Sequence, residues 1–285
     1  MEQREPGTGQ WFLNSSIFKS WAYGDVKTLW CPGIRQFSFL LKQEDYADIL
    51  KPVPARPCSR KYARMIIELN LTERSSIIVD NLRTRFGSDL GIGIASIYCN
   101  YKEQDEQTLG NILAGIWRQL VHNKTALSDD VKALYKKQIE KDTRPTVEAI
   151  DKVLSEEVAR YRAVYVIVDA LDECPEARRV KLLEKLQKMQ SSRSGLHLLA
   201  TSRIYDSIAR HFKGEPRLEI MANTEDVRAY VKGRITKGSR LERHVLKDPV
   251  LASDIENAIA AKSENMYDNF SMYVRKRVLS AAGFF

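Results

Sequence analysis

The sequence predicts an α/β fold, with a P-loop NTPase-like parallel sheet flanked by helices and a C-terminal helical segment. From residue 75 onward, short apolar runs alternate with longer stretches whose apolar residues recur at helical spacing. The strand-like runs are almost continuously apolar, as at the start of "VYVIVDALDEC" (164–174), which is typical of parallel strands buried on both faces. At 285 residues, the chain is long enough for one large domain or for a domain with an appendage.

The N-terminal part contains one strand and then departs from this alternation. We expect a linker and helix over residues 1–24, followed by the strand "VKTLWCPGI" (26–34), which ends in a Pro-Gly turn. Residues 35–74 hold three of the nine prolines and show no strand–helix rhythm. The α/β domain is therefore expected over 25–223, interrupted by an insertion at 35–74.

The later elements follow from periodicity and from residues that begin or end helices. Gly87 is placed to end the first of these helices, Thr146 to cap a later one, and Pro175 suits a first helical turn. Residues 224–285 are mainly helical, and we expect this segment to be truncated. In chain order, the predicted elements from residue 75 are a helix at 75–86, a strand at 92–101, helices at 108–121 and 146–161, a strand at 164–169, a helix from Pro175, and strands at 196–203 and 217–220.

Composition excludes some classes of protein. The chain is 44% hydrophobic and 29% charged, as soluble globular proteins are. No apolar run reaches the roughly 18 to 20 residues needed to cross a bilayer, and the polar start "MEQREPGTGQ" lacks the core of a signal peptide. We therefore expect a cytoplasmic protein without a membrane partner. Its net charge of +8 suggests nucleic acid, but the basic residues are dispersed over helical faces, which favours a solvated surface.

The cysteines show no metal-binding spacing, so ordinary thiols in a reducing compartment are expected. They are Cys31, Cys58, Cys99 and Cys174.

Three carboxylates follow the apolar run that begins at residue 164. The carboxyl end of a parallel strand faces the crevice in which open α/β sheets bind ligands, and carboxylates placed there need a positive partner. Mg²⁺ carried by nucleotide phosphates is such a partner. Asp169 would hold the metal, and Glu173 or Asp172 would orient or deprotonate the attacking water. The alternative is that the carboxylates cap the helix that begins at Pro175.

A second strand ends in polar residues that suit the same ligand. "LLATSR" finishes with Thr201, Ser202 and Arg203, and a guanidinium there could contact a terminal phosphate through two hydrogen bonds. The alternative is a surface arginine at the start of the next helix.

With these motifs, the chain resembles a known family. "VYVIVDALDEC" and "LLATSR" are similar to the Walker B and sensor regions of NACHT-type STAND P-loop NTPases, in particular the fungal group with a nephrocystin-3-like N-terminal domain. The resemblance extends over about 1–34 and 76–266. It implies a signalling ATPase or GTPase that binds Mg²⁺ with ATP or GTP, switches state on nucleotide exchange, and associates with itself or with protein partners.

The family's phosphate-binding loop is missing from this sequence. Where a glycine-rich loop ending in Gly-Lys-Ser/Thr is expected, the chain reads "CPGIRQFS", which keeps Gly33 but has no Gly-Lys, and no Gly-Lys occurs elsewhere. "GSDLGIG" (87–93) is glycine-rich but is predicted to be a turn between a helix and a strand. Charge-assisted hydrogen bonds are worth about 1.5–3 kcal/mol each, so losing several weakens binding by orders of magnitude. We expect no appreciable ATP or GTP hydrolysis.

Two hypotheses follow. The first is a nucleotide-binding regulatory module with impaired or absent catalysis. The second is a non-catalytic protein-interaction scaffold derived from an NTPase domain. The sharp edges of the departures near 35–74 and after residue 266 also suggest retained introns or frame errors in the gene model, with a divergent pseudo-NTPase as the rival explanation.

Overall fold

The computed structural model describes most of one compact unit, which carries the sheet. This unit comprises Trp11–Ile34 and Ser75–Ile220; a second unit comprises Met1–Gln10, Arg35–Arg74 and Met221–Phe285. Nearly all of the proposed insertion at 35–74 and nearly all of 224–285 lie outside the described residues; the last two residues of the proposed insertion are described and begin a helix. The residues that the structure describes are 9–33, 73–122, 145–191, 195–220, 225, 226, 228, 229, 250 and 253.

The sheet has four parallel strands in the order β1-β4-β3-β2. The strands are β1 (Thr28–Gly33), β2 (Ile92–Tyr98), β3 (Ala163–Asp169) and β4 (Leu196–Arg203). The predicted class, an α/β fold with a parallel sheet flanked by helices, is confirmed. β3 and β4 are buried along nearly their whole length, which explains why their sequences are almost continuously apolar.

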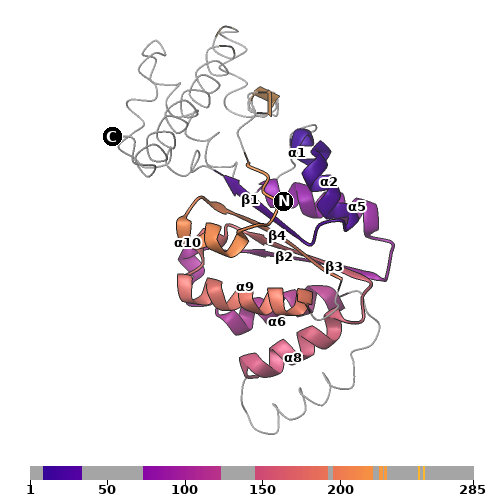
Figure 1. The fold of residues 1–285 in the computed structure, drawn as a ribbon, viewed down its shortest axis with the longest axis vertical. Helices are drawn as coiled ribbons and strands as arrows, with labels where there is room; N and C mark the ends of the chain where they lie inside the picture. The colour runs from indigo at the N-terminus through magenta and orange to yellow at the C-terminus, as the bar shows by residue number, and fades with distance from the viewer. Residues whose placement is uncertain are drawn as a thin grey trace. The chain divides into compact units, whose positions relative to one another are not determined.

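Helices cover both faces of this sheet (Figure 1). The apolar residues of a strand point alternately to the two faces, so β3 contributes Val164, Val166 and Val168 to one core and Tyr165 and Ile167 to the other. The first face carries α6 (Leu109–Val121), α8 (Val147–Val158) and α9 (Glu176–Ser191), and the second carries α1 (Gln10–Asn14), α2 (Ser16–Tyr23) and α5 (Glu73–Phe86).

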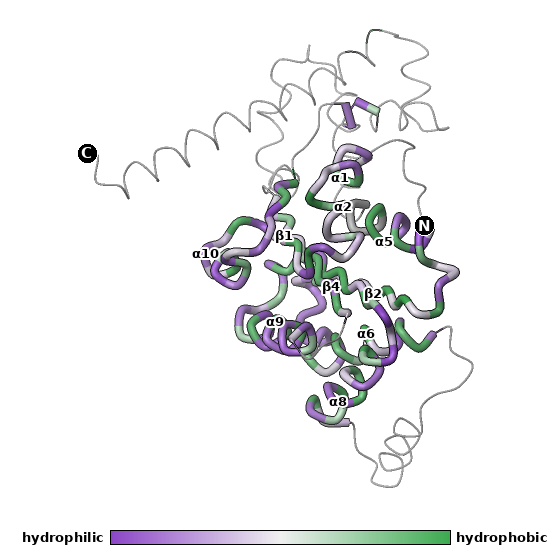
Figure 2. The backbone as a smooth tube through the Cα atoms, turned by 45° about the vertical axis from the view of Figure 1, so that its right-hand side comes forward, coloured by the Kyte–Doolittle hydropathy of each residue, from purple (hydrophilic) through white to green (hydrophobic). Residues whose placement is uncertain are grey.

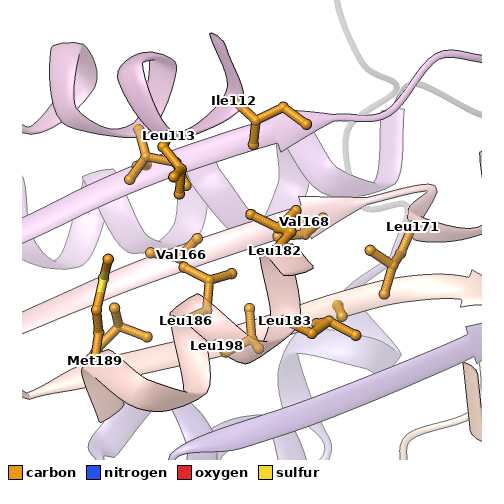
Figure 3. Close-up of a cluster of buried hydrophobic side chains, with 14 of the residues drawn as sticks. Ile112, Leu113, Val166, Val168, Leu171, Leu182, Leu183, Leu186, Met189 and Leu198 are labelled. Carbon is orange, nitrogen blue, oxygen red and sulfur yellow. The ribbon is translucent and has the colours of Figure 1, made fainter. Parts of the chain in front are cut away.

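The larger core lies between the sheet and helices α6 and α9. In Figure 3, Leu182 and Leu186 of α9 lie close to Val166 and Val168 of β3. Figure 2 shows the hydrophobic strands at the centre and mainly hydrophilic residues along α9. Because α9 has polar residues on its outer face, a single stripe is buried, made of three leucines with Arg179 and Met189, and this stripe fixes how the helix after the acidic turn sits on the sheet.

Several helices begin at side-chain caps that the sequence contains. Thr146 accepts a hydrogen bond from the Ala149 amide at 3.3 Å, as predicted, and Thr108 caps α6 in the same way. α5 ends at Phe86, directly before Gly87, as expected. These caps make the starts of helices predictable from short sequence patterns.

The helices α1 and α2 lie in the range for which the sequence predicted a linker and helix, residues 1–24, and they pack on the sheet. The indole Nε1 of Trp21 in α2 donates to the Leu198 carbonyl of β4 at 3.0 Å. Trp21 and Phe18 have no solvent exposure, because they lie in the second core, where they pack with residues of β1 and β4.

The predicted strand at 217–220 is wrong as an element, although its backbone does extend the sheet. Only isolated parallel bridges join Trp30 to Arg217 and Gly33 to Ile220. The Ile220 amide donates to the Pro32 carbonyl at 2.7 Å. The segment is too short to form a named strand, and it follows the short helix α10 (Asp206–Ala209) and a 3-10 turn, Arg210–Phe212.

At the other side of the described sheet, two glutamines bind the outer edge of β2. The Gln119 side chain accepts from the Ser96 amide at 3.0 Å and donates to the Ser96 carbonyl at 2.8 Å. Gln107 likewise accepts from the Asn100 amide and donates to the Tyr98 carbonyl. These side chains occupy backbone groups that another strand would otherwise pair with.

Candidate functional site

The candidate site is built from the carboxyl ends of adjacent parallel strands. The strand register aligns Gly33 of β1 with Arg203 of β4, and Tyr98 of β2 with Asp169 of β3. All four residues therefore lie along one edge of the sheet, as the sequence interpretation required.

Asp169 lies at the end of β3 and is held by the neighbouring strand. The Thr201 hydroxyl of β4 donates to Oδ1 of Asp169, and both side chains are buried. Thr201 also accepts a hydrogen bond from the Ala170 amide at 2.9 Å. The threonine predicted to contact a cofactor thus fixes both the carboxylate and the start of the next turn.

That turn brings the other two acids back toward the sheet. Ala170 has φ 54° and ψ 43°, the left-handed conformation, and it is the single non-glycine residue with positive φ among the described ones. A 3-10 turn, Leu171–Glu173, follows, and the Glu173 amide donates to the Ala170 carbonyl at 2.8 Å. Left-handed backbone at a residue with a Cβ costs about 1–2 kcal/mol, so this turn is held in place by its surroundings.

Asp172 forms an ion pair with Arg203. The Arg203 guanidinium contacts Oδ2 of Asp172, and the Arg203 amide donates to Oδ1 at 2.9 Å. The Asp172 side chain is 5% exposed and that of Arg203 25%. The guanidinium also lies 5.3 Å from the centre of the Tyr205 ring. The predicted water-activating acid and the predicted phosphate contact therefore bind each other.

Glu173 points to the loop that follows β2. Its carboxylate accepts a hydrogen bond from the Tyr101 amide at 3.1 Å. Burial raises the pKa of Glu173, and the negative charges of Asp172 and Asp169 raise it further, while the Tyr101 hydrogen bond and Arg203 oppose the shift. A raised pKa suits a group that exchanges a proton.

The β2–α6 loop is a part of the site that the sequence interpretation missed. The Gln104 side chain donates to the Glu173 carbonyl at 3.1 Å, and Arg178 donates to the Gln104 carbonyl at 2.8 Å. The 3-10 turn Tyr101–Glu103 begins at Asn100, whose side chain accepts from the Lys102 amide. A signal was available, because adjacent parallel strands place their carboxyl ends side by side, and the loop that follows β2 must then lie beside the end of β3.

At the end of β1, Gly33 is covered by a neighbouring segment of the chain. A Cβ added to Gly33 would come within 3.4 Å of the Ile220 carbonyl oxygen, so residue 220 covers this glycine. The residues that follow Gly33 lie outside the described part of the chain. In the strand register, Gly33 lies beside Arg203.

The residues of the site can be compared with the ligands that Mg²⁺ prefers. The ion prefers oxygen ligands and is usually bound through one or two carboxylates plus phosphate oxygens and water. The described residues contain no cluster of three His, Cys, Asp or Glu side chains able to hold a metal. The buried Asp169 carboxylate, with the Thr201 hydroxyl beside it, fits one ligand position of an ion that takes its remaining ligands from phosphate and water.

A separate cleft of about 910 Å³ lies at the opposite end of β2, where the strand begins. Its lining includes Arg83, Arg118, His122 and Ile92. Because parallel strands place their amino and carboxyl ends on opposite edges, this cleft is not part of the candidate site.

The comparison with protein families agrees with the motifs on β3 and β4. Residues 72–203 match the nephrocystin 3, N-terminal family. The matched stretch begins at residue 72, within the last three residues of the region proposed as an insertion, and ends at Arg203. The resemblance to the nephrocystin-3-like N-terminal domain is therefore confirmed over residues 72–203, which we call the nephrocystin-3-like segment. No curated protein matches the chain.

Two solved structures resemble the chain weakly. The Aeropyrum pernix ORC1 protein in complex with DNA has a TM-score of 0.43 at 12% identity, and the match covers 89% of this chain and 58% of that one. The chain thus spans under two thirds of that protein's length. The structure of C. elegans PCH-2 has a TM-score of 0.25 at 10% identity and covers 80% of this chain and 74% of that one. At these scores, neither likeness bears on the function of the nephrocystin-3-like segment.

None of the helices in the described ranges has the length and apolar character of a membrane span.

Proposed function

We propose that the chain is an NTPase-derived regulatory module of NACHT/STAND type that binds Mg²⁺ with ATP or GTP but does not hydrolyse the nucleotide appreciably. The observation that carries this proposal is the pairing of Asp172 with Arg203 beside the buried Asp169. The pair occupies the two side chains that would otherwise act on the attacking water and on the terminal phosphate. Asp169 and Glu173 keep carboxylates at the same edge of the sheet.

The roles of the individual residues follow from their contacts. Asp169, oriented by Thr201, would hold the metal ion, whose chemistry is to neutralise phosphate charge. Glu173, with its raised pKa and its hydrogen bond to the Tyr101 amide, would bind the water nearest the phosphates. Without a Gly-Lys phosphate loop, the remaining contacts support weak binding and leave transition-state charge unstabilised.

Nucleotide binding is tested by thermal unfolding of the full chain with increasing Mg-ATP or Mg-GTP. A ligand that binds only the folded state stabilises it by about 2.7 kcal/mol at a concentration one hundred times its dissociation constant. We expect a saturable rise in Tm for one of the two nucleotides, without phosphate release. Asp169→Asn, which keeps the shape of the side chain and its acceptor oxygen, should abolish the rise that depends on Mg²⁺.

A matched control is Asp89→Asn, because Asp89 lies at the other end of β2 in an exposed pair with Arg162. This variant should respond to nucleotide like the wild type. Asp169-dependent turnover well above background would overturn the hydrolysis-defective assignment. Equal Tm responses in both variants would overturn the assignment of Asp169 to the metal.

A second candidate is a protein-interaction scaffold that does not respond to nucleotide. The Asp172–Arg203 pair also favours it, because the pair is a structural connection between the β3 turn and β4 that needs no ligand. In that case neither nucleotide changes Tm, and function resides in self-association or in a protein partner. Light scattering of the full chain across a concentration series, with and without Mg-nucleotide, separates the two candidates.

A further inference from the structure

The cleft of about 910 Å³ at the amino end of β2, here called the β2 cleft, combines a sheet edge with one helix from each face of the sheet. β2 contributes residues 92–94, α5 contributes Arg83 and Phe86, and α6 contributes Arg118 and Leu120. Figures 1 and 2 both show β2 between these two helices. The volume lies within the range of ligand pockets, about 300–1,000 Å³.

Backbone groups of β2 that point away from β3 are available in this cleft. Successive residues of a parallel strand direct their amide and carbonyl alternately to the two sides. Because both groups of Ser96 bind the Gln119 side chain on the outer side, those of Ile94 and Ile92 also point outward. The Ile92 amide donates to the Asp89 carbonyl at 3.0 Å. Within the described ranges, the Ile94 amide and carbonyl and the Ile92 carbonyl have no partner on that side.

The lining of the β2 cleft has an excess of positive charge. Arg83 lies in the last turn of α5 and Arg118 in the last turn of α6, and neither forms an ion pair with another described residue. Asp89, the acidic residue of the lining, is already paired with Arg162 at 2.6 Å. The negative end of a helix dipole amounts to about half a charge, so each arginine leaves a positive excess at its helix end.

We propose that the β2 cleft is a docking site for an extended acidic peptide segment of a partner protein, which adds as a short strand to the outer edge of β2. The peptide backbone would bind Ile94 and Ile92. Successive side chains of a strand point to opposite faces, so two adjacent acidic residues would meet Arg83 on one face and Arg118 on the other. Leu90, which is 85% exposed, offers apolar contact to a flanking residue.

Gln119 sets the far limit of the docked segment. Its side chain occupies both backbone groups of Ser96, so a peptide can pair only with residues 92–94. Because this contact is short, charged and apolar side chains must supply much of the binding free energy. Docking needs no bound nucleotide, because the β2 cleft and the candidate site lie at opposite edges of the sheet.

Two other occupants fit the cleft less well. A second copy of the chain, joined through the same edge, would bring Arg83 and Arg118 against their own counterparts, and like charges repel. A small anion would pair with the arginines but would leave the outward backbone groups of Ile94 without partners. An extended peptide with adjacent acidic residues satisfies the charges and the backbone together.

Binding is measured by fluorescence anisotropy of a labelled peptide, VTEDVT, titrated with the full wild-type chain. The matched peptide VTKKVT has the same length and the opposite charge. We expect saturable binding of the acidic peptide, weakened by added salt because exposed charges are screened, and no saturable binding of the basic one. Equal binding of the two peptides, or no saturable binding of either, would overturn the proposal.

Strand addition is tested by changing the peptide, which leaves the folding of the protein untouched. Alternate amides of a strand face the same neighbour, so N-methylation of one alternate set in the acidic peptide should abolish binding, and N-methylation of the other set should preserve it. Amide hydrogen exchange of Ile94, followed by NMR, should slow when the peptide binds. Equal effects of the two methylation patterns, with unchanged exchange at Ile94, would rule out strand addition.

Variants locate the peptide on the protein. Arg83→Gln and Arg118→Gln should each weaken binding about two- to fivefold, which is the effect of losing one exposed ion pair. Arg85→Gln is the matched control, because Arg85 lies in the same last turn of α5 but over the Tyr23 ring, 4.7 Å from its centre, and outside the cleft lining. This control should bind like the wild type. Equal weakening by Arg85→Gln and Arg83→Gln would show a general effect of charge and overturn the assignment to the β2 cleft.

Competition distinguishes the other occupants. Free glutamate at the concentration of the peptide should not displace it, and displacement would assign the cleft to small anions. Light scattering of the full chain should show no dimer that the acidic peptide dissociates. Such a dimer would assign this edge to a second copy of the chain and overturn the proposal.

Discussion

The Arg203 amide donates to Oδ1 of Asp172 at 2.9 Å, while the Arg203 guanidinium pairs with the other oxygen of the same carboxylate. This arrangement joins the end of β4 to the turn that follows β3. The two side chains for which the sequence predicted roles in catalysis and phosphate binding thus stabilise the shape of this edge of the sheet. The ion pair therefore contributes to folding stability, and its contribution can be measured without any ligand.

Replacing Asp172 should destabilise the fold. Asp172→Asn removes the charge opposite Arg203 and leaves a mostly buried guanidinium without its partner, so we expect the free energy of unfolding to fall by about 2–3 kcal/mol. Urea denaturation followed by tryptophan fluorescence measures the change. Asp89→Asn breaks an exposed pair, with Arg162 71% and Asp89 39% exposed, and should cost much less stability than Asp172→Asn. Equal losses in the two variants would contradict a structural role for the Asp172–Arg203 pair.

Replacing Thr201 tests how Asp169 is held. Thr201→Val keeps the shape but removes the hydroxyl that donates to Asp169 and accepts from the Ala170 amide. A buried carboxylate and a partly buried amide each lose a hydrogen-bond partner, so the free energy of unfolding should fall by about 1–3 kcal/mol. Thr201→Ser keeps the hydroxyl and should retain most of this stability. If the serine variant is as unstable as the valine variant, the lost methyl packing and not the hydrogen bonds explains the effect.

The left-handed conformation of Ala170 gives a prediction of opposite sign. Glycine adopts φ 54° without the clash of a Cβ, and the relief outweighs glycine's greater entropy in the unfolded chain. Ala170→Gly should therefore raise the free energy of unfolding by about 0.5–1 kcal/mol. Ala159→Gly is the matched control, because Ala159 has an ordinary right-handed conformation at the end of α8 and should lose stability. A loss of stability at residue 170 as well would show that the turn carries no strain.

His197 predicts how stability changes with pH. Its ring stacks on Tyr165, with the ring centres 5.0 Å apart, and burial lowers its pKa below 6.5, with Lys27 adding to the shift and the Val26 carbonyl opposing it. As pH falls through 6.5, the unfolded chain binds a proton before the folded chain does. Stability contributed by neutral His197 is thus present above this pH and lost below it.

Urea unfolding at a series of pH values tests this dependence. Wild-type stability should decline as pH falls from about 7 toward 5, in the range where histidine titrates. His197→Gln should show a flatter profile over the same range, even if it is less stable throughout. An unchanged slope in the variant would assign the acid sensitivity to another group.

Much of the fold followed from local pattern because each element is specified by its own residues. The apolar run into Asp169 and the run "LHLLATSR" (196–203) can only be buried strands, and Thr146 begins a helix through a hydrogen bond to a residue three positions away. The segment at 217–220 was predicted to be a strand because its residues are extended and partly apolar. In the structure it makes only two isolated bridges to β1, which a few extended residues are enough to form.

The site was predictable in position but not in its pairings. Sequence placed Asp169 and Arg203 at one edge of the sheet because parallel strands share their direction. That Asp172 and not a ligand would bind Arg203 depends on the left-handed turn at Ala170, which has no sequence signal of its own. The contact between Glu173 and the Tyr101 amide joins residues far apart in the chain, and only the assembled sheet brings them together.

The two glutamine side chains on β2 also bear on the route by which this chain reaches its native state. Gln119 is carried by α6, so the outer backbone of Ser96 is satisfied only after that helix has docked. Before docking, β2 would have an unpaired outer edge that could form hydrogen bonds with the same edge of a neighbouring molecule. If the sheet assembles before the helix docks, newly made chains are therefore most prone to aggregation between these two steps. Docking of the Gln119 side-chain amide onto Ser96 ends this period.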